Sequence, residues 1–130
     1  MMTGSCLCGG VKYTIDGELG PVALCHCQMC RKASGTAFAT NASVARAAFR
    51  LVAGDSLVRR YESSPGKWRC FCAVCGSPLF GETTEMPDHV RIRLGLVEGD
   101  PGVRPAYHFA VNFKAPWWEI TDSLPQLDLS

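Results

Sequence analysis

The alternation of apolar and polar residues along this 130-residue chain predicts short β-strands. Val11, Tyr13 and Ile15 alternate with polar neighbours, which is the period-two pattern of a strand with one buried face. Residues 90–94 and 107–111 repeat this alternation. Further extended segments are expected at residues 22–27, 36–42, 49–52, 57–62, 67–72 and 79–83. The pattern favours an all-β fold, a sandwich or a barrel.

Turn signals separate these strands. Gly54-Asp55 lies between two expected strands, so we predict a hairpin with a type II′-like turn there. Residues 31–35 and 45–48 are each expected to form one helical turn, the first ending at Gly35. Because 130 residues are too few for two well-packed cores, residues 1–130 are expected to form a single domain.

Composition and charge exclude several classes of protein. Hydrophobic residues make up 47% of the chain and charged residues 19%, as in an ordinary folded domain. The formal net charge of +1 provides no strong field for nucleic acid or an anionic membrane. The first residues lack the basic and apolar regions of a signal peptide. We therefore expect a cytoplasmic protein with no nucleic-acid or membrane partner.

The eight cysteines form three tight clusters. The clusters are Cys6-x-Cys8, Cys25-x-Cys27-x-x-Cys30 and Cys70-x-Cys72-x-x-Cys75. Such spacing lets several sulfurs converge on one metal ion at about 2.3 Å. Disulfides are rare in the cytosol, and a bridge across one intervening residue is strained. The clusters do not match two common ferredoxin spacings, so zinc is favoured over iron and sulfide.

Spacing alone leaves the division of the cysteines open. Two sites of four thiolates would use all eight and give a purely structural protein. A division into four and three would leave one zinc with a vacant position, which is typical of catalytic zinc. The pairs Cys27/Cys30 and Cys72/Cys75 have the spacing of zinc knuckles, whose two sulfurs usually bind one metal.

Four segments of the chain resemble a known family. They are GSCLCGGV at 4–11, CHCQMCRKASGTAF at 25–38, FCAVCGSPLF at 71–80 and KAPWW at 114–118. In this order they resemble the glutathione-dependent formaldehyde-activating enzyme family, which also includes centromere protein V. The resemblance implies a β-tent-like antiparallel sandwich held together by two zinc ions.

The resemblance also implies a role for most of the cysteines. The closed structural zinc would be bound by Cys6, Cys8, Cys72 and Cys75. The second, catalytic zinc would be bound by Cys25, Cys27 and Cys30, with one open position for a thiol.

The activity implied is that of a carbon–sulfur lyase. It would join a small thiol such as glutathione to formaldehyde or a related small aldehyde as S-(hydroxymethyl)glutathione, and cleave this adduct in reverse. Arg31 and Lys32 follow Cys30 directly and are expected to bind the glutathione carboxylates. Arg91 and Arg93 are expected to be solvated surface charges. The alternative function is a zinc-stabilised interaction module, or a metal or redox sensor, without a catalytic metal.

Three residues lie outside this assignment. Cys70 is expected to be a buried spare thiol, although completing the second site would be the alternative and would fill its open position. His26 alternates with two proposed ligands, so it should point to the opposite face, as a second-sphere or surface residue. His108 is a candidate for proton transfer. The oligomeric state does not follow from the sequence.

Overall fold

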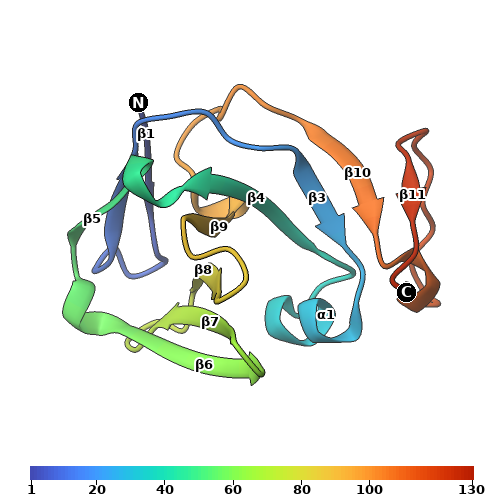
Figure 1. Cartoon of the computed structure of the whole chain (residues 1–130), viewed down its shortest axis with the longest axis horizontal. Helices are drawn as coiled ribbons and strands as arrows, with labels where there is room; N and C mark the ends of the chain where they lie inside the picture. Colours follow the sequence, from blue (N-terminus) through green and yellow to red (C-terminus); the bar gives the residue numbers. More distant parts are fainter.

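The computed structural model describes all residues 1–130 and consists of two β-sheets and one α-helix (Figure 1). The smaller sheet has the order β1-β2-β5 and is antiparallel. Its strands are β1 (Met2–Ser5), β2 (Lys12–Ile15) and β5 (Phe49–Ala53). The prediction of a mostly β protein is therefore confirmed, with the N-terminal strand β1 as an element that the sequence pattern did not reveal.

The larger sheet has eight strands in the order β11-β10-β3-β4-β9-β8-β7-β6. These are β3 (Val22–Cys25), β4 (Ala39–Ala45), β6 (Val58–Ser64), β7 (Lys67–Cys72), β8 (Pro78–Thr83), β9 (His89–Arg93), β10 (Pro105–Phe109) and β11 (Gln126–Leu127). In Figure 1 the β6–β7 end of this sheet lies at the bottom of the view, and its inner strands β3 and β4 lie above it. The expected antiparallel pairing is confirmed for the other strands, but β10 is parallel to both β3 and β11, so the larger sheet is mixed.

The hydrophobic core lies between the two sheets. Tyr13 and Ile15 of the smaller sheet belong to the same buried cluster as Val90 and Ile92 of the larger sheet. Arg91, between the last two, is exposed, so the predicted alternation of β9 is confirmed. Burial of these apolar side chains stabilises the packing of one sheet on the other.

The predicted hairpin around Gly54 was wrong. Strand β5 pairs with β2, whereas β6 pairs with β7, so the two expected arms belong to different sheets. The Tyr13 and Phe49 rings pack with centroids 5.1 Å apart, across the β2–β5 pairing. Local turn residues indicated a change of direction correctly, but burial of these aromatic side chains determines which strand β5 joins.

The helix α1 (Gln28–Ser34) is longer than the single predicted turn. It begins after Cys27, whose sulfur accepts a hydrogen bond from the Cys30 N–H, and ends at Gly35 with φ 71°. A left-handed residue of this kind, usually glycine, commonly ends a helix. The short 3₁₀ helices are η1 (Arg46–Ala48), η2 (Asp55–Leu57), η3 (Leu94–Leu96) and η4 (Val111–Phe113). None of the helices has the length and apolarity needed to cross a bilayer.

Gly54 is the point where the chain passes from one sheet to the other, so a substitution at Gly54 tests the importance of this connection. Its φ is 78°, and an added Cβ would collide with the Gly10 carbonyl. We expect Gly54→Ala to lower the free energy of unfolding by about 2–4 kcal/mol, because left-handed strain and a backbone clash add. Chemical denaturation measures this difference.

Gly99→Ala is the matched control for this substitution. Gly99 has φ 74°, but a Cβ there would have no atom within 4 Å. Its cost should be limited to the left-handed conformation, about 1 kcal/mol. Equal losses in the two variants would show that Gly54 does not need its close approach to Gly10.

Candidate metal centres

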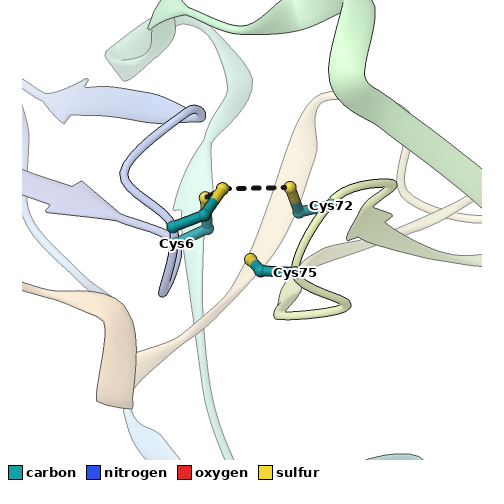
Figure 2. A group of neighbouring side chains, drawn as sticks. Cys6, Cys72 and Cys75 are labelled. Atoms are coloured by element: carbon teal, nitrogen blue, oxygen red, sulfur yellow. Dashed lines mark hydrogen bonds between the residues drawn. The ribbon is translucent and has the colours of Figure 1, made fainter.

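Four cysteines from two distant segments converge beside the core. Cys6 and Cys8 lie in the loop between β1 and β2. Cys72 is the last residue of β7, and Cys75 lies in the connection from β7 to β8. Their sulfurs all lie within 4.8 Å of one another, with 3.5 Å between Cys6 and Cys8 and 3.8 Å between Cys8 and Cys72. Figure 2 shows the side chains of Cys6, Cys72 and Cys75 pointing toward a common centre.

Hydrogen-bond donors surround these sulfurs. The backbone N–H of Val11 donates to Cys6 Sγ at 3.3 Å, and that of Gly10 donates to Cys8 Sγ at 3.4 Å. Hydrogen bonding by Ser77 lowers the pKa of Cys75 to about 5. Such donors stabilise thiolates, the form in which cysteine binds metal. Four convergent thiols with these donors fit a tetrahedral, sulfur-preferring ion.

A second group is formed by three cysteines of one short segment. Cys25 ends β3, Cys27 caps α1, and Cys30 is a buried residue in the first turn of α1. Their sulfurs also lie within 4.8 Å of one another. The Cys30 N–H donates to Cys27 Sγ at 3.3 Å, so capping the helix and orienting the sulfur are the same interaction. The group brings together three candidate ligands and no fourth one.

The three thiols do not share charge equally. Hydrogen bonds from Cys25 and Cys30 lower the pKa of Cys27, and the Arg69 charge lowers it further. The hydrogen bond to Cys27 raises the pKa of Cys25. Nη2 of Arg69 lies 3.8 Å from Cys30 Sγ. The site therefore favours negative charge on sulfur, as a metal-binding thiolate group requires.

The three-cysteine group opens into a hollow of about 300 Å³. Four cations line it, and none of them forms an ion pair: Lys67, Arg69, Arg91 and Arg93. Arg93 Nη1 donates to Asn41 Oδ1 at 2.5 Å. Burial, followed by the nearby Arg69 charge, lowers the pKa of Arg93 to about 10. Arg93 is thus a half-buried cation rather than the solvated charge expected from the sequence.

Arg31 and Lys32, the predicted cofactor-binding residues, lie elsewhere. They line a separate hollow together with Trp117 and are not among the residues around the cysteine hollow. Their role toward glutathione stays a prediction. The sequence did not point to Arg69, because its proximity to Cys30, 39 positions away, arises only from the tertiary fold.

Cys70 belongs to neither cysteine group. It is 2% exposed, and its sulfur donates to Glu82 Oε1 at 3.7 Å. Glu82 is itself ion-paired with Arg46 at 2.6 Å and Arg60 at 3.4 Å. The expectation of a buried spare thiol is confirmed. The alternative, in which Cys70 completes the three-cysteine group, was wrong.

His26 points away from the cysteine group, as its place between Cys25 and Cys27 predicted, but it is completely buried. Its Nε2 lies 2.8 Å from Nδ1 of His108, whose Nε2 in turn contacts the carboxylate of Asp122. Asp122 was missed by sequence reasoning, since no spacing rule connects it with either histidine.

Comparison with known proteins now identifies the family. The sequence model described as "Glutathione-dependent formaldehyde-activating enzyme" matches residues 1–112. The chain belongs to this family. Membership indicates an activity related to glutathione and formaldehyde. A search of curated proteins found no match.

A solved structure supports the fold independently. The crystal structure of a Rhodobacter sphaeroides protein superposes with a TM-score of 0.66 and 22% sequence identity. The match covers 76% of this chain and 90% of that one. At this identity the likeness establishes the shared fold.

The environment of Cys70 predicts a chemically inert thiol. Burial, followed by the Glu82 charge, raises the pKa of Cys70 to about 11. At pH 8 only about one such thiol in a thousand is ionised, and alkylation requires the thiolate. Iodoacetamide labelling followed by peptide mass mapping should leave Cys70 unmodified in the folded protein and modify it in denaturant. Labelling of Cys70 in the native protein as fast as that of a free thiol would contradict this assignment.

Proposed function

We propose that this member of the family is a zinc-dependent carbon–sulfur lyase of the S-(hydroxymethyl)glutathione synthase type. In this proposal Cys6, Cys8, Cys72 and Cys75 bind a closed structural zinc. Cys25, Cys27 and Cys30 bind a second, catalytic zinc, whose fourth position receives the sulfur of the thiol substrate. The observation that carries the proposal is the three-cysteine group that opens into a hollow and lacks a fourth protein ligand.

The hollow supports a thiol substrate that bears carboxylates. Its cations have no acidic partner, and the one acid lining it, Glu82, is already paired with two arginines. Unpaired guanidinium groups bind carboxylates through charge-assisted hydrogen bonds. Glutathione carries two carboxylates as well as its thiol. The arrangement therefore favours glutathione over a neutral thiol, with Arg69 Nη2 3.8 Å from Cys30 Sγ, one of the proposed zinc ligands.

The chemistry needs one bond to form and one proton to move. A bound zinc supplies Lewis acidity that favours the thiolate form of a thiol ligand near neutral pH. In the synthetic direction the thiolate sulfur attacks the formaldehyde carbon, and the carbonyl oxygen takes up a proton to become a hydroxyl. In the reverse direction the hydroxyl loses its proton and the carbon–sulfur bond breaks. Arg69 and Arg93 hold and orient the anionic substrate in both directions.

Metal analysis tests the two proposed centres. The purified protein should contain two zinc ions per chain. Cys27→Ser should retain one zinc and keep the fold, because the three-cysteine group lies on one short segment. Cys8→Ser should lose the other zinc and unfold more readily, because that site joins two distant segments and metal binding there is coupled to folding. Circular dichroism and elemental analysis measure both properties.

Two results would contradict the proposal of two independent zinc centres, one of them catalytic. Loss of both zincs from Cys27→Ser would show that the centres are not independent. Failure of the two-zinc protein to bind any thiol would favour a zinc-stabilised interaction module instead. Cys70→Ala is the control and should retain both zincs.

Substrate charge is tested by substituting Arg69. We expect Arg69→Met to raise the KM for glutathione about 10–100-fold, because a charge-assisted hydrogen bond to a carboxylate is lost. The KM for 2-mercaptoethanol should change little, since this thiol has no carboxylate. Arg59→Met, on the exposed strand β6 and outside the hollow, is the matched control. An equal rise in KM for both thiols would indicate that Arg69 acts on the metal group rather than on the substrate carboxylates.

A further inference from the structure

A continuous chain of hydrogen-bonded polar side chains begins at His26, on the side of the backbone opposite the three-cysteine group. His26 is 0% and His108 1% exposed, and they are joined by the 2.8 Å contact between His26 Nε2 and His108 Nδ1. His108 Nε2 lies 3.1 and 3.0 Å from the two carboxylate oxygens of Asp122. The rings of Phe38 and Trp118 pack against each other, and that of Phe38 also packs against both histidines. This chain of polar groups therefore joins the buried His26 to Asp122, a half-exposed acid of the C-terminal segment.

The hydrogen bonds assign the protons. An ionised carboxylate only accepts hydrogen bonds, so His108 Nε2 carries a hydrogen and its N–H donates a hydrogen bond to Asp122. Hydrogen bonding by His108 lowers the pKa of Asp122 and keeps it ionised. In a neutral His108 the other nitrogen, Nδ1, is then an acceptor, so His26 Nε2 must be the donor. Asp122 thus determines the tautomer of both rings.

In the sequence His26 lies between two proposed zinc ligands, Cys25 and Cys27, although its ring points away from them. Its backbone N–H donates to the Phe109 carbonyl at 2.9 Å, and β3 pairs with β10 in register from Leu24 and His108 to Cys25 and Phe109. Main chain and side chain therefore both attach His26 to β10. Because His26 is attached through both its backbone N–H and its ring, the flanking Cys25 and Cys27 are held with their sulfurs on the opposite side of the chain.

We propose that Asp122 and His108 are positioning residues for the three-cysteine metal centre, acting through His26. The C-terminal segment beyond residue 112, which the family model does not match, is in this view part of the centre. The inference rests on the proposed function in one respect, namely that Cys25, Cys27 and Cys30 bind zinc. It does not depend on which thiol or aldehyde reacts.

The test compares zinc release from the two centres of the two-zinc protein. In excess chelator, the wild type should lose zinc in a fast phase from the three-cysteine centre and a slow phase from the four-cysteine centre. Asp122→Ala should accelerate the fast phase about 10-fold, the lower end of the effect of removing an outer-sphere partner of a metal ligand, because Asp122 acts on the cysteines only through two histidines. The slow phase should not change, because the four-cysteine centre has no contact with this chain of groups.

Two further variants separate positioning from a general loss of stability. Asp122→Asn keeps a side-chain oxygen that accepts the His108 proton, so it should release zinc within about threefold of the wild-type rate. Glu119→Gln removes a neighbouring exposed acid that makes no hydrogen bond and should have no effect. Imidazole ¹⁵N spectra of the three histidines provide a second readout. The Nε2–H form of His26 and His108 should dominate in the wild type and in Asp122→Asn, and become mixed in Asp122→Ala.

Each contrary result has a distinct meaning. A fast phase in Asp122→Ala within twofold of wild type, or equal acceleration of both phases, would overturn the positioning role. So would an Asp122→Asn protein that releases zinc as fast as Asp122→Ala. A wild-type protein holding only one zinc would overturn both this inference and the proposed function. Two zincs without thiol chemistry would remove only the lyase proposal and leave the positioning role supported.

Discussion

The convergence of Cys6 and Cys8 with Cys72 and Cys75 is the constraint on which the arrangement of this molecule depends. It joins the first loop of the smaller sheet to the end of β7 and the β7–β8 connection of the larger one, and Cys8 and Cys72 are 64 positions apart in the sequence. A metal ion there would close this long loop and remove much of the conformational freedom of the unfolded chain. Two interactions would then stabilise the packing of the two sheets: burial of the apolar core that contains Tyr13 and Ile15, and metal binding by the cysteines next to it.

The three-cysteine group is built in the opposite way. Its sulfurs come from six consecutive residues, so the turn between β3 and α1 is enough to bring them together. What surrounds them comes from far along the chain: Arg69 from β7, Arg91 and Arg93 from β9, and the histidine chain from β10 and the C-terminal segment. A locally assembled group with a distant environment can keep its metal chemistry while the surrounding residues determine charge and substrate.

The two sides of this group have different functions in the proposed scheme. On one side the cationic hollow is accessible and its charges are unpaired, which favours reversible binding of an anionic substrate. On the other side His26 and His108 are buried and hydrogen-bonded, which suits a fixed support. Cys70 lies outside both sides, where burial and then the Glu82 charge raise its pKa and keep the thiol protonated.

Cysteine spacing left the division into groups of four and three open, and only the resemblance to the family supplied it. The sequence by itself determined the mostly β character, the alternation of β9, the end of α1 at Gly35 and the clustering of the cysteines. These features depend on periodicity and short spacing, which are properties of neighbouring residues. The tertiary structure alone decided that β5 leaves β6 to pair with β2, that β10 runs parallel to β3, and that Cys70 turns to Glu82. It also decided that Arg69 and Arg93 rather than Arg31 and Lys32 line the cysteine hollow, and that Asp122 reaches His108. Such pairings depend on how a bent sheet brings distant strands together to bury apolar surface, and no local spacing encodes that choice.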